Sequence, residues 1–135
     1  HCADPSRYLD LVAGTCRSGD LWVLRDDFPV VDRQGEQQRL WNDFRQGWHA
    51  LNRLTPGETD RLAEKHGFDL VSDRDMTPYL DIDRPRDHLT VAAFFLLRPL
   101  GLNSAWWQNL RGGYALRQLL KSDRMSYRFR VWRRR

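Results

Sequence analysis

The apolar positions near the start of the chain recur at three- and four-residue steps, which is the spacing of one helix face. Asp4 suits the N-cap of this helix, Pro5 suits its first position, and Gly19 suits its end. The predicted apolar face consists of Tyr8, Leu9, Val12, Ala13 and Cys16. The pattern therefore predicts an amphipathic helix at the start of the chain.

A continuous apolar run follows Gly19 and predicts a strand over Leu21–Arg25. We expect both faces of this strand to be buried, because its residues do not alternate between apolar and polar. Asp26 and Asp27 come directly after it, and a loop is expected from Phe28 onward. In an open α/β sheet, the loops at the carboxyl ends of the strands line the ligand crevice. These three residues are therefore candidates for chemistry.

The rest of the pattern predicts further helices and two further strands, in the alternation that is typical of an α/β fold. The predicted helices run from about Glu36 to Arg53, from the capping box Thr55-Pro56-Gly57-Glu58 to His66-Gly67, from Asp83-Arg84-Pro85 to Pro99 and Gly101, and from Ser104 to a break at Gly112-Gly113, resuming over Tyr114–Ser122. The predicted strands are Phe68–Asp73 and Met125–Trp132. The longest apolar run, Val91–Leu97, suits a buried helix.

Composition narrows the class of protein. The chain has no apolar run long enough for a membrane span and no recognisable signal peptide. It begins with His1 in a loop rather than with Met, so we expect its beginning to be missing. Cys2 precedes the first helix and Cys16 lies near its end, roughly 18 Å away at ~1.5 Å per residue, which is too far for a disulfide. Free thiols favour the cytoplasm, and no metal-site spacing is present.

The formal charge of +4 raises the question of nucleic-acid binding. Much of the excess lies at the C-terminus, in Arg128, Arg130, Arg133, Arg134 and Arg135. Apolar and basic residues alternate over Tyr127–Val131, which predicts a strand with one solvated face followed by a basic tail. A nucleic-acid patch is the less favoured interpretation, because no recognition motif accompanies the charge.

The order of these segments resembles the C-terminal half of a class I S-adenosylmethionine-dependent methyltransferase of the small-molecule type. The resemblance rests on Asp4-Pro5, Gly19, Asp26-Asp27, the capping box and His66-Gly67-Phe68, taken in that order. It implies that Leu21–Arg25, Phe68–Asp73 and Met125–Trp132 correspond to strands five, six and seven of that fold. The implied sheet order is 5-7-6, with the last strand in the middle and antiparallel to both others.

The sequence departs from the family in two ways. The family's glycine-rich loop and acidic ribose-binding residue belong to its N-terminal half, so the S-adenosylmethionine site would lie mostly outside this chain and no cofactor-binding residue is assigned. The family usually joins strands six and seven by a tight hairpin, whereas here a helical insertion over about 84–122 separates them. That insertion is expected to cover the substrate pocket or to stabilise a homodimer.

The resemblance also nominates site residues. Asp26 or Asp27 would orient the methyl acceptor or act as a base, and His1 would lie beside the cofactor sulfonium. The expected substrate-binding residues are Phe28, Trp41, Trp48, His49 and Tyr79. The structural alternatives are backbone capping for the two carboxylates, an ordinary loop position for the histidine, and core packing for the tryptophans.

The sequence therefore predicts the substrate-side half of a cytoplasmic methyltransferase that uses S-adenosylmethionine and acts on a small, hydrophobic molecule. The chain alone would be inactive, no metal is expected, and the partners would be the acceptor and a second subunit. Two other functions stay open. One is a non-catalytic α/β interaction module, and the weaker one is a basic nucleic-acid-binding domain.

Overall fold

The computed structural model describes residues 4–30, 38–50, 54–101 and 104–135, and the chain divides into two compact units. The first unit comprises His1–Val30, Leu51–Pro78 and Met125–Arg135. The second comprises Val31–Ala50 and Tyr79–Arg124. The first unit therefore holds the strands, and the second corresponds to the predicted middle helix together with the helical insertion.

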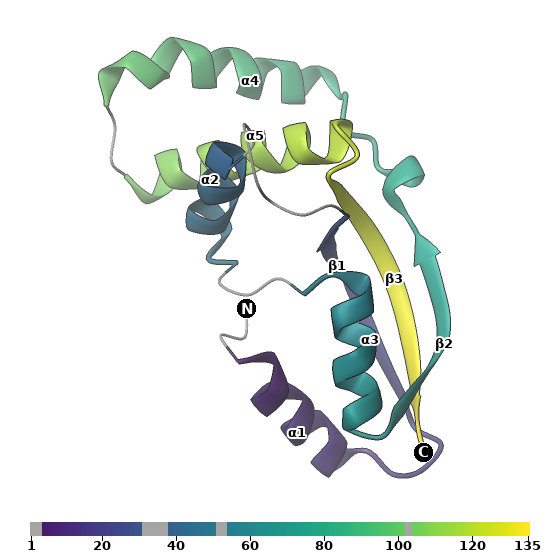
Figure 1. Cartoon of the computed structure of the whole chain (residues 1–135). Helices are drawn as coiled ribbons and strands as arrows, with labels where there is room; N and C mark the ends of the chain where they lie inside the picture. Colours follow the sequence, from purple (N-terminus) through teal and green to yellow (C-terminus); the bar gives the residue numbers. More distant parts are fainter. Residues whose placement is uncertain (1–3, 31–37, 51–53, 102–103) are drawn as a thin grey trace. The chain divides into compact units, whose positions relative to one another are not determined.

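The described strands of the first unit form one antiparallel sheet. They are β1 (Leu21–Pro29), β2 (Phe68–Asp75) and β3 (Met125–Arg134). Their spatial order is β1-β3-β2, so the last strand of the chain lies in the middle (Figure 1). β3 pairs antiparallel with both neighbours. The predicted order of the sheet is therefore confirmed.

Two helices of this unit pack on the sheet through apolar side chains. They are α1 (Pro5–Thr15) and α3 (Pro56–Lys65). The Asp4 carboxylate caps α1, and Thr55 and Glu58 form the predicted capping box of α3. The buried cluster between helices and sheet consists of Leu9, Trp22, Ala63, Phe68 and Trp132. The rings of Trp22 and Trp132 stack there with centroids 4.3 Å apart.

The structure corrects three details around the first strand. β1 continues to Pro29, so the expected loop at Phe28 is part of the strand. Leu21 and Val23 are 55% and 50% exposed, so the expectation that both strand faces are buried is wrong for this chain. Helix α1 ends at Thr15, before Gly19, whose φ of +91° instead places it in the left-handed turn that leads into β1.

The predicted solvated face of β3 is also wrong at its centre. Arg130 is fully buried rather than exposed. Its guanidinium donates to both carboxylate oxygens of Asp60 on α3 at 2.8 and 2.7 Å and to the Pro56 carbonyl at 3.0 Å. The Asp73 carboxylate on β2 lies 3.2 Å from Arg130 Nε. The period-two pattern cannot reveal this, because the compensating carboxylates come from distant segments.

The described helices of the second unit are α2 (Gln38–Trp48), α4 (Pro85–Leu97) and α5 (Ala105–Lys121), and the short turn η2 (Arg98–Leu100) follows α4. The short turn η1 (Thr77–Tyr79) lies where the chain passes from the first unit to the second. α4 and α5 lie side by side (Figure 1). Their contact is aromatic, because Phe94 of α4 stacks on Tyr114 of α5 at 4.5 Å and on Trp107 at 5.4 Å.

Two expectations for these helices are wrong. α5 runs without interruption through Gly112-Gly113, which were expected to break it. The apolar run of α4 is not wholly buried, since Leu96 is 77% and Phe95 is 52% exposed. Among the described residues, no helix is long and apolar enough to cross a membrane. Cys16 is a free thiol, and Cys2 lies outside the described residues.

Candidate functional site

The second unit contains a pocket of about 300 Å³ between α4, α5, the end of α2 and the segment before α4. Its apolar wall consists of Trp48, Leu80, Ile82, Val91, Tyr114, Leu116 and Leu120. Its polar wall consists of Asp81, Arg84, Arg86, Asp87, Thr90 and Arg117, and Gly113 completes the lining. This volume is at the lower end of the ~300–1,000 Å³ that is usual for ligand pockets.

The pair Gly112-Gly113 shapes one side of this pocket. A Cβ on Gly112 would lie 2.5 Å from Trp48 Cδ1, so only a glycine lets the indole approach α5 this closely. A Cβ on Gly113 would meet nothing within 4 Å, and Gly113 lines the pocket. The first glycine therefore seats an aromatic wall residue, and the second leaves open space beside it.

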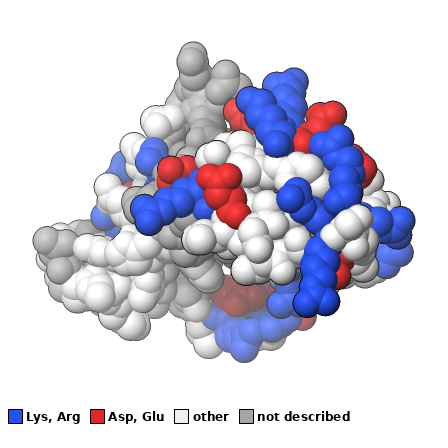
Figure 2. Space-filling view, turned by 90° about the horizontal axis from the view of Figure 1, so that it is seen from below, with Lys and Arg blue, Asp and Glu red and all other residues white. Residues whose placement is uncertain are grey.

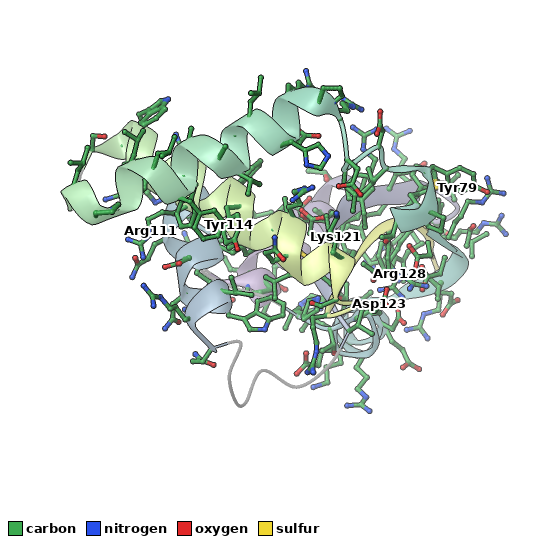
Figure 3. All side chains as sticks on the ribbon, turned by 90° about the horizontal axis from the view of Figure 1, so that it is seen from above. Tyr79, Arg111, Tyr114, Lys121, Asp123 and Arg128 are labelled. Atoms are coloured by element: carbon green, nitrogen blue, oxygen red, sulfur yellow. The ribbon has the colours of Figure 1, made fainter. Side chains whose placement is uncertain are left out.

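Aromatic packing fixes a second part of the pocket wall. In Figure 3, Tyr114 lies between α4 and α5. Its ring stacks on Phe94 at an interplanar angle of 14° and meets Phe95 edge-on with centroids 5.7 Å apart. Because two rings hold Tyr114 from α4, its side chain is a fixed part of the wall rather than a mobile one.

Ion pairs hold the segment that precedes α4 against α5. Arg117 donates from Nε to the Ile82 carbonyl at 2.9 Å and from Nη2 to Asp83 at 2.5 Å. Lys121 Nζ lies 2.6 Å from the same Asp83 oxygen. The hydrogen bond from Lys121 is the largest of the causes that act on the pKa of Asp83 and lowers it. Desolvation, the second largest, raises it, and the hydrogen bond from Arg117 lowers it further, so the pKa lies below its ordinary value.

This arrangement predicts an acid-sensitive contact. The folded-state pKa of Asp83 lies below its ordinary value of 3.8, so the carboxylate contributes stability above that pH and loses it as the pH falls through the folded pKa. Asp83→Asn should therefore lower the urea midpoint of the full-length protein near neutral pH, and the difference from wild type should shrink below pH 3.8. Asp69→Asn is the control, because Asp69 forms a looser, exposed pair with Arg135 at 3.6 Å. A difference independent of pH would contradict this account.

The structure brings one of the nominated substrate residues into the pocket. Trp48 lines it and is 46% exposed. Trp41 is 2% exposed and belongs to the core of the unit, as the structural alternative for the tryptophans predicts. His49 is exposed just after α2 with a φ of +50°, and Tyr79 is 76% exposed at the end of η1. Neither of these two lines the pocket.

The nominated carboxylates belong to the first unit and lie within β1 rather than after it. Asp26 is exposed, and Asp27 is half-buried. Asp26 accepts a hydrogen bond of 2.8 Å from the Asp27 amide, which is the local backbone contact that the structural alternative describes. Successive residues of a strand point to opposite faces of the sheet, so these two side chains cannot both face the same site.

Phe28 and His1 are the remaining nominated residues. Phe28 is 4% exposed, and the Arg130 guanidinium lies 5.4 Å from the centre of its ring, which indicates a packing role in this unit. His1 lies outside the described residues, so its predicted place beside the cofactor stays a prediction. The described residues contain no group of three or more His, Cys, Asp or Glu side chains that could hold a metal ion.

Most of the pocket lining was not predicted from the sequence. Leu80 and Ile82 come from the stretch between the predicted strand Phe68–Asp73 and the helix expected from Asp83, and Arg117 comes from the helix expected to resume at Tyr114. A Gly-Gly pair ordinarily marks a turn, so it gave no signal of a pocket. Here it lies inside α5, where Gly112 lets the indole of Trp48 approach the helix.

Comparison with known proteins identifies the fold of this chain. No family model matches the chain, and no curated protein matches it. A solved protein from Galdieria sulphuraria, provisionally named a sarcosine dimethylglycine methyltransferase, superposes with a TM-score of 0.66 at 14% identity over 98% of this chain and 48% of its own. The StiE O-methyltransferase, residues 942–1257, gives a TM-score of 0.69 at 12% identity over 98% of this chain and 40% of its own.

Both superpositions cover nearly all of this chain but less than half of the solved one. The sheet has its last strand in the middle, which is the order that the family resemblance implies. This chain thus has the α/β fold of the C-terminal part of S-adenosylmethionine-dependent methyltransferases.

Proposed function

We propose that this chain is the substrate-side part of an S-adenosylmethionine-dependent methyltransferase that acts on a small, hydrophobic molecule. The observation that supports the proposal most directly is the superposition of 98% of the chain on two methyltransferases. The apolar pocket of about 300 Å³ in the helical unit adds a place for a small acceptor. Methyl transfer mainly requires that the acceptor and the methyl donor are aligned in a pocket that excludes water. The apolar pocket of the helical unit would meet this requirement on the acceptor side.

The described residues do not fit the cofactor itself. A phosphate- or nucleoside-binding turn of this fold class follows a strand and opens a helix. The glycines with positive φ at the strands, Gly19 and Gly67, precede β1 and β2 instead. This chain would bind and orient the acceptor, and S-adenosylmethionine would supply the methyl group from a site built mostly by other residues of the full-length protein.

A non-catalytic interaction module is the second candidate function. The exposed apolar residues of α4 and η2 favour it, since Leu89 is 72%, Leu96 is 77% and Leu100 is 64% exposed. Nucleic-acid binding has weaker support. Lys and Arg side chains occur in several groups with Asp or Glu side chains beside them on the face shown in Figure 2. Cytoplasmic location and a homodimer stay predictions.

Calorimetric titration of the full-length protein with S-adenosylmethionine tests the proposal. We expect micromolar binding, followed by methyl transfer to an apolar acceptor in a substrate screen with labelled cofactor. The chain of residues 1–135 alone should neither bind the cofactor tightly nor transfer methyl groups. Failure of the full-length protein to bind S-adenosylmethionine would reject the proposal in favour of the interaction module. Tight binding by the chain alone would reject the assignment of the cofactor site to other residues of the full-length protein.

The carboxylates of β1 give a separate prediction. Because Asp26 and Asp27 point to opposite sheet faces, we expect one of the two Asp→Ala variants of the full-length protein to reduce turnover more than tenfold, with the melting temperature nearly unchanged. Neither residue is fully buried, so its loss leaves no cavity. Turnover and thermal melting are measured on the same preparations. If both variants keep wild-type turnover, this strand takes no part in the chemistry.

A further inference from the structure

The pocket of the second unit has two aromatic side chains in its wall. Trp48 is seated against α5 by Gly112, and Tyr114 is held by Phe94 and Phe95 of α4. The side chains of Ile82 and Leu116 complete the apolar surroundings. A planar ring gains more binding free energy from such walls than an aliphatic chain of equal size, because aromatic rings also stack on one another. A pocket of about 300 Å³ suits a molecule of one or two rings.

Four of the five charged side chains that line the pocket have a polar partner within 3.1 Å, and the fifth, Arg86, is largely exposed. Arg84 lies 3.0 Å from Asp81, and Arg117 lies 2.5 Å from Asp83. The Asp87 carboxylate accepts a hydrogen bond from the Arg84 amide at 3.1 Å and lies 3.9 Å from Arg86. A carboxylate or ammonium group that entered the pocket would have to compete for partners already in use while it lost its own hydration.

We propose that this pocket binds an uncharged, ring-bearing molecule in preference to a zwitterionic amino acid. That this molecule is the methyl acceptor rests on the proposed function. That the pocket takes such a molecule rests only on its aromatic walls and its internally paired charges. This preference would separate the chain from the solved protein whose provisional name refers to sarcosine and dimethylglycine, although the two share a fold.

Gly113 offers a substitution that fills the pocket without disturbing the helix. It lines the pocket inside α5, has no strained backbone angle, and a Cβ there would meet nothing within 4 Å. Leucine is also a better helix former than glycine. Gly14→Leu is the matched control, because Gly14 lies in α1, outside the pocket, and a Cβ there also meets nothing within 4 Å.

The test uses 2-naphthol as the uncharged two-ring probe and dimethylglycine as the zwitterionic one, titrated into the full-length protein by calorimetry. Wild type should bind 2-naphthol at least tenfold more tightly than dimethylglycine. Gly113→Leu should weaken 2-naphthol binding at least tenfold, whereas Gly14→Leu should change it less than twofold. If Gly113→Leu does not fold, Gly113→Ala adds one methyl group to the pocket and should weaken binding at least threefold.

Three results would overturn the inference: no saturable binding of 2-naphthol by wild type, equal or tighter binding of dimethylglycine, or unchanged binding in the folded Gly113 variant. S-adenosylmethionine is titrated into the same samples to separate the two proposals. If 2-naphthol binding depends on Gly113 but no sample binds the cofactor, the pocket assignment holds and the methyltransferase function fails. If the cofactor binds but 2-naphthol binding does not depend on Gly113, the methyltransferase function holds and the pocket assignment fails.

Discussion

Asp60→Ala is expected to lower the free energy of unfolding by about 3 kcal/mol, because it removes the main partner of a buried charge. Arg130 is fully buried and gives two hydrogen bonds to the Asp60 carboxylate, at 2.7 and 2.8 Å. The indole Nε1 of Trp132, another fully buried residue, donates to the same carboxylate at 3.2 Å. The substitution therefore leaves two buried donors without their acceptor.

The remaining contacts of Arg130 set the size of the effect. Asp73 stays 3.2 Å from Nε, and the Pro56 carbonyl stays within 3.0 Å of Nη1. Asp73 is also engaged by Arg128 at 2.8 Å, so one carboxylate would have to compensate two guanidiniums. We therefore expect a loss close to that of a broken buried pair rather than that of a surface pair, which is about 0–1 kcal/mol.

Urea unfolding of the full-length protein, followed by tryptophan fluorescence, measures this effect. The double variant Asp60→Leu/Arg130→Met is the control, because replacing both charges by apolar groups removes the unpaired charge and should restore most of the lost stability. Arg128→Met tests the neighbouring, partly exposed arginine and should cost less, since its side chain is 24% exposed. An Asp60→Ala variant as stable as wild type would show that Arg130 is satisfied without Asp60.

Arg130 also shows which structural features a local sequence pattern can predict and which it cannot. The alternation over Tyr127–Val131 correctly predicts a strand, because a period of two is a property of the strand itself. The alternation also predicts that the basic face is solvated, whereas Arg130 on that face is fully buried. Which side of a strand is buried depends on what packs against it, and the carboxylates that accept Arg130 lie 70 and 57 positions earlier in the chain, as Asp60 and Asp73.

The strand order could be predicted, but only through the family resemblance. Nothing in the residues of β3 shows that it inserts between β1 and β2 rather than adding at an edge. The caps could be predicted from the residues alone, since Asp4 and the Thr55-Glu58 pair bond to backbone amides within three positions. Local hydrogen bonds are therefore the features that the sequence determines most directly.

The pocket could not be predicted for a related reason. Its walls come from separate segments that meet only by packing, around Trp48, Ile82 and Tyr114. The tryptophans of α2 illustrate the limit, because Trp41 and Trp48 are seven positions apart on one helix, yet one is core and the other lines the pocket. Helical spacing gives the direction of a side chain, and the neighbouring helix decides whether that direction leads to a core or to a cavity.

Gly47→Ala is expected to lower the free energy of unfolding by about 2 kcal/mol or more, because α2 and α5 approach each other at this glycine more closely than a side chain allows. A Cβ on Gly47 would lie 2.6 Å from the Cα and 2.8 Å from the amide nitrogen of Gly112. Both obstacles are backbone atoms of α5, so no rotamer change can relieve the contact. The helices would have to move apart, and the stacked rings of Phe44 and Trp48 on α2 would move with them.

Helix propensity changes the free energy of unfolding in the opposite direction, so a destabilising Gly→Ala change can be attributed to the steric contact. Alanine is a better helix former than glycine by about 1 kcal/mol, so a Gly→Ala change without a steric clash should stabilise. Gly14→Ala in α1 is such a change, since a Cβ there meets nothing within 4 Å, and Gly113→Ala is a second one within α5 itself. The signs of the three effects on the urea midpoint should therefore differ, with Gly47→Ala alone destabilising. If Gly47→Ala proves as stable as Gly14→Ala, the two helices do not cross at the distance described, and Trp48 does not owe its place in the pocket wall to this contact.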